Sequence, residues 1–404
     1  MKTLQEQSQE CLAVSAPLPV FGVELADASG CILADDVHSI VNIPAQDLAA
    51  TDGYAIRAKD VFGASHESPV SLPVVAEIQS DDFDRYVYTE NTAILVSSGA
   101  QMPRGADCVV PLELTDRGQA TVRVFEAVDE HENVRTQAED VRAGDVLVAA
   151  GTRISSRHIA LVASGGQDRV TVRPNPRVVV MSIGDDIVEA GKPLPAGKRY
   201  DADSYAIAAG VVNAGGVPYR VGCVSDDKQV LREAIEDQLV RADVIITTGG
   251  LSYGASDTLR DVLAELGSVR FDALAMEPVH RMGVGTLEDG IRLFCLPGEP
   301  VAAMVAFDVF VRPALRKMQG YQHVQQQVIR AHAERGFASP QGKDEFVRVR
   351  VHGDPISGYG FTVQGENSRP LLRSLSQANG LAHVPMDVTT VGIGDELDCM
   401  IFAG

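Results

Sequence analysis

The chain has 404 residues, enough for about two to four domains, and its composition excludes several classes of protein. Asp and Glu number 55 against 35 Lys and Arg, which gives a formal net charge of -20 at pH 7. General binding to nucleic acid or to an anionic membrane needs a positive surface, so we expect neither partner. An anionic small molecule remains compatible with this charge, because a local basic rim, a helix N-terminus or a bound cation can hold one.

The 6 cysteines are scattered through the chain and form no CxxC pair. Several lie in apolar runs, such as Cys295 in the segment LFCL, which predicts buried reduced thiols and argues against a zinc site. The N-terminal segment MKTLQEQSQECLAV has no apolar signal region, and no apolar run approaches the roughly 18 residues that a membrane span needs. We therefore expect a cytoplasmic protein.

The first part of the chain predicts one helix followed by mostly β structure. The helix spans residues 4–14, and Pro17 ends it. From about residue 42 to residue 144, β-branched residues are interrupted by turn residues every 8–12 positions, which is typical of an all-β module. The predicted strands of this part are residues 70–78, 92–96, 107–111, 120–125 and 144–148, and a short helix follows at 158–163.

After Pro176 strands and helices alternate, which predicts βαβ units and a mostly parallel sheet. Asp203 is expected to cap the first of these helices, and Gly215 to close it. The strands are predicted at residues 177–182, 217–224, 243–248 and 292–296, and the helices at 203–213, 226–241, 257–266 and 301–317.

The character changes again after Gly320, where alternating apolar and polar residues predict a small all-β domain. Its expected strands are residues 344–351, 361–364, 381–385 and 396–402.

Polar or glycine-rich loops follow each of the four strands of the predicted sheet. Ligands of open parallel sheets bind outside the carboxyl ends of the strands, so these loops are expected at one edge. Glycines allow close backbone approach, the helix starts after Gly254 and Gly298 attract phosphate, and the carboxylates suit a bridging Mg²⁺. The loops are SIGDD at 182–186, SDD at 225–227, TTGG at 247–250 and PGEP at 297–300.

A purely structural explanation is open for three of these acids, because Asp186, Asp226 and Asp257 also suit helix caps or first helical turns. The sequence lacks GxGxxG and GxxxxGKS, which excludes dinucleotide and P-loop sites of those types. It also lacks HExxH, and its histidines are isolated.

Several sequence blocks, in the same order along the chain, resemble the molybdopterin molybdenumtransferase family, which includes the E domain of gephyrin. Together they cover essentially the whole chain, and the ordered set is far more specific than any single block. The blocks are TDGYA at 51–55, SGAQMPRGAD at 98–107, ED at 139–140 with GD at 144–145, ADVIITTGGLSYG at 242–254, LPGEP at 296–300, and SL at 374–375 with ANG at 378–380.

The resemblance implies a homodimer of multidomain chains with α/β and all-β parts. Residues 1–22 and 176–319 would form a three-layer α/β molybdopterin-nucleotide-binding domain, and 23–41 with 145–175 an elongated linking and dimerisation domain. A β-rich module at 42–144 would lie across the dimer from the partner's site. A small β-barrel-like domain would follow at 320–404.

The reaction that the resemblance implies is the last step of molybdenum cofactor assembly. Molybdate and adenylylated molybdopterin enter, molybdenum is placed on the dithiolene, and AMP leaves with Mg²⁺ assisting. Expected protein partners are a molybdopterin adenylyltransferase and molybdoenzyme-maturation proteins.

The family's functional residues are carried over residue by residue. The resemblance implies catalytic roles for Asp52, Ser98, Asp140, Asp186 and Asp257, and a Mg²⁺ site among Asp186, Asp226 and Asp257. The expected substrate-binding residues are Gly184, Asp226, Gly249, Gly250, Ser252, Gly254, Pro297, Gly298, His280 and Arg281.

The departures from the family pattern affect residues that are expected to bind the anionic substrate. The usual segment Met-Lys-Pro-Gly-Lys-Pro aligns with MEPVHR at 276–281, so Glu277 reverses the charge of one lysine. A reversed charge beside phosphate is expected to cost several kcal/mol of binding unless a cation intervenes. Glu299 and Asp203 each stand where the family has Asn, and the positive charge is expected from His280, Arg281, Arg369 or Arg373.

Three functions therefore remain open from the sequence. The first is an active molybdenum or tungsten insertase. The second is a paralogue that binds molybdopterin or its nucleotide as a carrier or regulator. The third is a nucleotide pyrophosphatase of the same α/β superfamily, which the β-rich module and the C-terminal domain disfavour.

Overall fold

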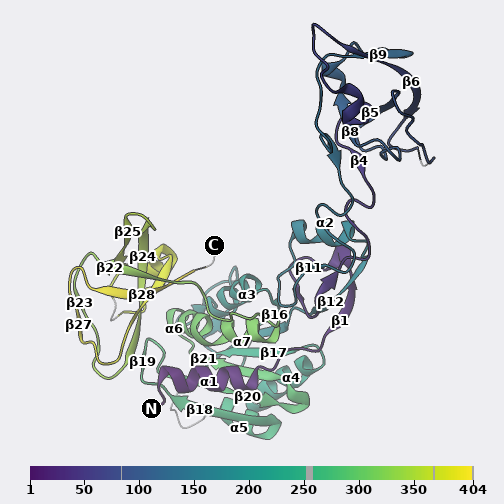
Figure 1. The fold of residues 1–404 in the computed structure, drawn as a ribbon. Coiled ribbons are helices and arrows are strands. Elements are labelled where there is room, and N and C mark those ends of the chain that lie inside the picture. Colours follow the sequence, from purple (N-terminus) through teal and green to yellow (C-terminus); the bar gives the residue numbers. More distant parts are fainter. Residues whose placement is uncertain (83, 252–257, 367–368, 403–404) are drawn as a thin grey trace. The chain divides into compact units, whose positions relative to one another are not determined.

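The computed structural model describes residues 1–82, 84–251, 258–366 and 369–402, and the chain folds into two compact units (Figure 1). The first unit comprises Met1–Phe21, Gly30–Ala34 and Val172–Gly404, and the second comprises Gly22–Ser29 and Asp35–Thr171. Strands β1 (Phe21–Glu24), β2 (Ile32–Leu33) and β12 (Arg169–Arg173) lie where the chain passes from one unit to the other. None of the helices in the described ranges is long and apolar enough to cross a membrane.

A six-stranded sheet forms the centre of the first unit. Its order is β16 (Val217–Val224), β13 (Arg177–Ile183), β17 (Val244–Thr248), β21 (Arg292–Leu296), β20 (Arg281–Leu287) and β18 (Gly267–Ala273). The first four strands are parallel, as the sequence predicts, so their carboxyl ends lie at one edge. Strands β20 and β18 are antiparallel and were not predicted.

Two glycines hide the strand character of β20 in the sequence, because glycine has a low strand propensity. A Cβ on Gly285 would lie 2.1 Å from the carbonyl oxygen of Ser268, and one on Gly283 would lie 2.7 Å from the Phe271 ring. Close packing against β18 therefore requires glycine at both positions.

Helices cover both faces of the sheet and give three layers (Figure 1). Successive side chains of a strand point to opposite faces, so Val178 packs on one side of β13 and Val179 on the other. The helices on the Val178 side are α1 (Leu4–Val14), α3 (Asp203–Asn213), α6 (Pro300–Ala306) and α7 (Arg312–Met318), and those on the Val179 side are α4 (Lys228–Leu239) and α5 (Thr258–Leu266).

Two local predictions need correction. Asp203 is the first residue of α3 rather than its cap, and the Asp201 carboxylate accepts the hydrogen bond from the backbone N–H of Ser204 at 3.0 Å. The single helix predicted over 301–317 is interrupted by a π-helical turn at Phe307–Val311. Pro313 lies one turn further on and has no N–H to donate, which favours such an irregularity.

A small closed barrel completes the first unit, as expected. Its strands follow the order β24 (Asp344–Asp354), β25 (Gly358–Val363), β22 (Val328–Ala333), β28 (Glu396–Ile401) and β26 (Gly380–Val384), and β26 pairs with β24 to close the ring. The α/β domain adds β19 (Met276–Glu277), which runs parallel to β24 with Glu277 opposite Glu345. The remaining elements are β14 (Ile187–Val188), β15 (Arg199–Tyr200), β23 (Phe337–Ala338), β27 (Thr390–Val391) and α8 (Leu372–Gln377).

The second unit is β-rich, in agreement with the prediction. A five-stranded sheet has the order β8 (Cys108–Pro111), β5 (Gly53–Ile56), β7 (Ala93–Val96), β6 (Val70–Ile78) and β9 (Thr121–Val124). Apolar clusters lie on both of its faces, with Tyr54 in one and Ala55 in the other. The other elements are β3 (Val37–His38), β4 (Leu48–Ala49), β10 (Val134–Arg135), β11 (Val146–Val148) and α2 (Ser156–Ser164).

Candidate functional site

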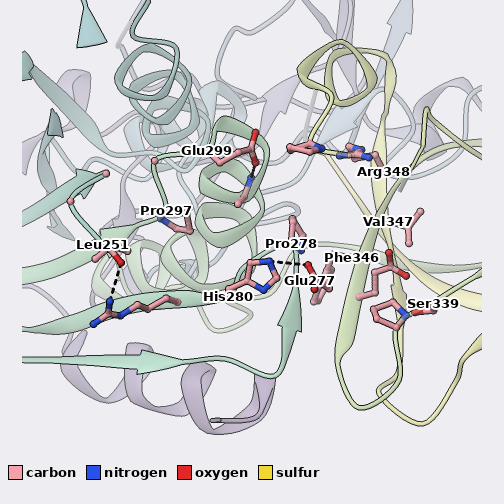
Figure 2. Close-up of a pocket in the computed structure, with 18 of the residues that line it drawn as sticks. Leu251, Glu277, Pro278, His280, Pro297, Glu299, Ser339, Phe346, Val347 and Arg348 are labelled. Carbon is pink, nitrogen blue, oxygen red and sulfur yellow. Dashed lines mark hydrogen bonds and ion pairs between the residues drawn. The ribbon is translucent and has the colours of Figure 1, made fainter. Parts of the chain in front are cut away.

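A pocket of about 1000 Å³ lies within the first unit, between the carboxyl edge of the sheet and the C-terminal barrel (Figure 2). The α/β side contributes Arg199, Gly249, Gly250, Leu251, Glu277, Pro278, His280, Arg281, Pro297, Gly298, Glu299 and Ala302. The barrel side contributes Ala338, Ser339, Pro340, Glu345, Phe346, Val347, Arg348 and Pro370. Its volume suits a ligand larger than a simple nucleotide.

Two glycine loops form the part of the pocket next to the strands. Gly249 follows β17 with φ 84°, and a Cβ there would lie 2.4 Å from the carbonyl oxygen of Ile183. A Cβ on Gly298 would lie 2.9 Å from the Cα of Gly249. The two loops therefore pack backbone against backbone, and the Gly249 N–H donates to the carbonyl oxygen of Leu296 at 3.2 Å, so a ligand meets this wall of the pocket without a covering side chain.

Glu299 caps α6. Its Oε1 accepts a hydrogen bond from the Val301 N–H at 3.1 Å, and its Oε2 accepts one from the Ala302 N–H at 2.8 Å. A negative charge at a helix N-terminus is favourable, so this acid stabilises the helix on which it sits. The same two N–H groups are then occupied and do not face a phosphate.

Glu277 has two partners, a lysine and a histidine. Its Oε1 lies 2.7 Å from Nζ of Lys343, which belongs to the barrel. Its Oε2 lies 3.2 Å from Nε2 of His280 (Figure 2). Glu277, which reverses a charge in the family pattern, is therefore paired with a lysine from the barrel. Nothing in the local sequence around Glu277 signals this, because Lys343 follows 66 residues later.

Arg281 holds the loop that follows β17. Only 8% of this residue is exposed, and its Nη1 donates a hydrogen bond to the carbonyl oxygen of Leu251 at 2.9 Å (Figure 2). The guanidinium group also lies 5.9 Å from the centre of the Phe271 ring, a favourable cation–π distance. Arg281 thus brings positive charge to the pocket and fixes one of its loops.

Arg199 joins two strand-end loops. Its Nε donates to Oδ2 of Asp186 at 2.9 Å, and its Nη1 donates to the carbonyl oxygen of Gly298 at 2.8 Å. Asp186 is therefore connected to the pocket through Arg199, which the sequence analysis did not single out.

The barrel side presents two buried charged residues, Glu345 and Arg348, which are 6% and 4% exposed. Arg348 donates from Nη2 to the carbonyl oxygens of Glu366 and Arg369, both at 3.0 Å. Burial lowers the pKa of Arg348, although an arginine stays charged at neutral pH, and burial raises the pKa of the Glu345 carboxyl. Arg348 Nε and Glu345 Oε2 have no hydrogen-bond partner among the described residues.

A second group of polar side chains lies near this edge. Oxygen and sulfur atoms of Glu189, Asp201 and Cys223 lie within 4.8 Å of one another, a spacing compatible with a metal. Arg220, however, forms ion pairs with both Glu189 and Asp201. Its guanidinium group supplies the positive charge there, so the cluster is explained as an ion-pair network.

Comparison with known proteins decides the family. The chain is 35% identical over 425 aligned positions to molybdopterin molybdenumtransferase 1 of Mycobacterium tuberculosis, and the alignment covers 100% of this chain and 99% of that protein. The chain belongs to the molybdopterin molybdenumtransferase family. A relative of the same name from Bacillus subtilis is 31% identical and covers 90% of this chain and 85% of its own.

Family models and solved structures agree with this membership. Residues 2–166 match the MoeA N-terminal region (domains I and II), 179–317 the probable molybdopterin binding domain, and 330–402 the MoeA C-terminal region (domain IV). The crystal structure of a molybdopterin biosynthesis MoeA protein from Pyrococcus horikosii has a TM-score of 0.85 at 27% identity, with 100% of both chains covered.

The residues that the family resemblance implied lie in several places. Six of them line the pocket: Gly249, Gly250, His280, Arg281, Pro297 and Gly298. Gly184 and Asp186 lie in the adjoining loop after β13, whereas Asp226 is exposed before α4 and does not line the pocket. Ser252, Gly254 and Asp257 lie outside the described residues.

The three residues expected from the β-rich module lie in the second unit, all exposed. The Ser98 N–H donates to Oδ1 of Asp52 at 2.7 Å, so these two are neighbours. The Asp140 N–H donates to the carbonyl oxygen of Ile43 at 3.1 Å. Of the arginines expected to supply charge, Arg281 lines the pocket, while Arg369 and Arg373 are exposed and do not. The buried arginine that does line it, Arg348, was missed because it lies in a regular strand pattern.

Proposed function

We propose that this protein inserts molybdate into adenylylated molybdopterin and releases AMP. The observation that carries the proposal is the pocket itself, in which glycine loops face four positively charged or ionisable side chains. These are Arg199, His280, Arg281 and Arg348. The names of the relatives in Mycobacterium tuberculosis and Bacillus subtilis support the same reaction.

Binding follows from the distribution of charge. The phosphates of the nucleotide would lie along Gly249 and Gly250, which line the pocket without side chains and where Arg199 supplies a counter-charge. Molybdate would be attracted to Arg348, because its buried guanidinium group has an Nε–H without a hydrogen-bond partner among the described residues, and such a group attracts an oxyanion strongly in a poorly solvated site. The chain's contribution is to hold the two anions close together and to reduce their repulsion.

Mg²⁺ fits this edge with substrate phosphates as additional ligands. Asp186 is one of the carboxylates at this edge, and its Oδ2 already accepts a hydrogen bond from Arg199. Mg²⁺ commonly takes one or two carboxylates together with phosphate oxygens and water, so Asp186 with Asp257 would suffice. When bound, the ion would neutralise the phosphoanhydride and make AMP a better leaving group.

Asp52, Ser98 and Asp140 are proposed to act from the partner chain of a homodimer. The hydrogen bond from Ser98 to Asp52, and the location of all three residues in the second unit, support a role in orienting molybdate or water. The division into four domains and the location in the cytoplasm are parts of the same proposal. Matches to MoeA domains I, II and IV support the division.

Mixing the purified protein with adenylylated molybdopterin, Mg²⁺ and molybdate tests the proposal. We expect AMP and active cofactor to appear together, and both to disappear when molybdate or Mg²⁺ is omitted. Substitution of Arg348 by Met, which keeps the bulk of the side chain, should abolish molybdate-dependent AMP release. Arg330→Met on the exposed face of the barrel is the matched control. Tight nucleotide binding without AMP release would instead identify a carrier.

A further inference from the structure

The barrel side of the pocket contains a buried acid with one unsatisfied carboxylate oxygen. Glu345 is 6% exposed, lines the pocket, and its Oε2 has no hydrogen-bond partner among the described residues. A buried carboxylate oxygen without a hydrogen-bond partner destabilises the unliganded protein. A ligand that donates hydrogen bonds to Glu345 removes this cost.

The neighbouring acid shows the contrast. Glu277 lies opposite Glu345 in the pairing of β19 with β24 and has ion pairs with Lys343 and His280. Within the described part of the chain, no ion pair of this kind reaches Glu345. The sheet therefore places two carboxylates side by side; Glu277 forms an ion pair with Lys343, whereas the described residues give Glu345 no ion pair, although the charge of Arg348 acts on it.

Resting on the proposed function, we propose that Glu345 recognises the pterin ring of the substrate by accepting hydrogen bonds from its 2-amino group and N3–H. These two donors lie side by side at one edge of the ring, and a carboxylate offers two acceptors with the same spacing. The adenine half of the substrate lacks such a pair, because its 6-amino donor adjoins the N1 acceptor.

The surroundings of Glu345 suit a flat heterocycle. Pro278, Pro340 and Pro370 also line the pocket, and their rings form apolar walls. Burial raises the pKa of the Glu345 carboxyl, and the charge of Glu277 adds to this rise, while Ser339 and the charge of Arg348 oppose it. Two hydrogen bonds donated by the ligand lower the pKa of this carboxyl again and favour its ionised form. The ionised form in turn accepts these hydrogen bonds more strongly.

This placement orients the whole substrate. The pterin would lie against the barrel and the phosphates against Gly249 and Gly250 at the strand edge. The dithiolene, which lies between these two ends of the molecule, would then face the middle of the pocket. In this arrangement the C-terminal domain provides the selectivity for the pterin ring.

Binding measurements with 6-hydroxymethylpterin, 6-hydroxymethyllumazine and AMP test the proposal by titration calorimetry. The lumazine has an oxo group where the pterin has its 2-amino group. We expect the unmodified protein to bind the pterin at least about 10-fold more tightly than the lumazine. This comparison needs no variant, so it stays decisive if a substitution prevents folding.

Glu345→Gln should weaken pterin binding by about 10- to 100-fold and leave AMP binding unchanged. Glu345→Asp, which keeps the charge on a shorter arm, should retain part of the selectivity, and Glu396→Gln on an exposed strand is the matched control. Equal binding of pterin and lumazine by the unmodified protein, or loss of AMP binding in Glu345→Gln, would overturn the assignment. A pterin-selective protein that never releases AMP would refute the proposed function and leave the Glu345 assignment standing.

Discussion

Lys343 of the barrel and Glu277 of the α/β domain form an ion pair of 2.7 Å at the side of the pocket. Both side chains are less than a third exposed, at 29% and 26%. The pair turns an acid that would repel phosphate into a nearly neutral group.

Removal of Lys343 should therefore leave Glu277 free to repel the phosphate of a bound nucleotide. Lys343→Ala is expected to weaken AMP binding by about 3- to 10-fold, because Glu277 then keeps only His280 as a partner. The double variant Lys343→Ala with Glu277→Gln should restore the affinity. Titration calorimetry checks both, with Lys228→Ala in an exposed ion pair as control. Equal AMP binding by all these proteins would show that the pair does not face the nucleotide.

Asp203 is predicted to make stability depend on pH. Burial raises the pKa of its carboxyl from 3.8 to about 7, and the nearby charge of Asp201 adds to the rise. The folded protein thus keeps a proton that the unfolded chain releases above about pH 4, so stability falls as the pH rises from about 4 to 7 and stays reduced above 7.

Asp203→Asn should remove this dependence. Its gain in unfolding free energy is expected to be about 2 kcal/mol at pH 8 and much smaller at pH 5. Thermal unfolding at the two pH values measures the difference. Asp237→Asn, on the exposed face of α4, removes one charge without burial and should show no such change. If both variants showed the same change in the pH dependence of stability, the burial of Asp203 could not be its cause.

Alanine substitutions at Gly249 and Gly191 allow the cost of backbone strain to be measured separately from the cost of a steric clash. Both have positive φ, 84° and 85°, but a Cβ on Gly249 would meet the Ile183 carbonyl oxygen at 2.4 Å, whereas one on Gly191 meets nothing within 4 Å. Gly191→Ala should cost about 1 kcal/mol of stability, from the backbone alone. Gly249→Ala should cost about 3 kcal/mol or more and move the loop at the pocket. Urea unfolding of the two variants measures these losses of stability. Equal losses would contradict the predicted clash between a Cβ at position 249 and the Ile183 carbonyl oxygen.

Asp186 and Arg199 allow the Mg²⁺ assignment to be tested. If Asp186 acts only by positioning Arg199, then Asp186→Asn and Arg199→Met should reduce AMP release by similar factors, and the double variant by no more than either. If Asp186 binds Mg²⁺, its substitution alone should raise the Mg²⁺ concentration needed for half-maximal activity. Titration of Mg²⁺ in the three variants distinguishes the two roles.

The sequence by itself determined the elements that have strong local patterns. The strands at 177–182 and 292–296 are continuous apolar runs, and the module at 42–144 has regular turn punctuation, so their structures follow from the residues. The parallel order of the strands then places Gly249, Gly298 and Asp186 at one edge, as predicted. The family blocks added the membership that the comparisons confirm.

Only the tertiary structure decided how charges meet in the pocket. Glu345 and Arg348 lie in β24, and Lys343 immediately precedes that strand. All three are far from Glu277 in the chain, and the pairing of β19 with β24 brings them near it. Strands β18 and β20 depend on glycines that fit only against a particular neighbour. Ion pairs, burial and close backbone contacts arise between distant segments, and a local pattern carries no information on which distant residue will be the partner.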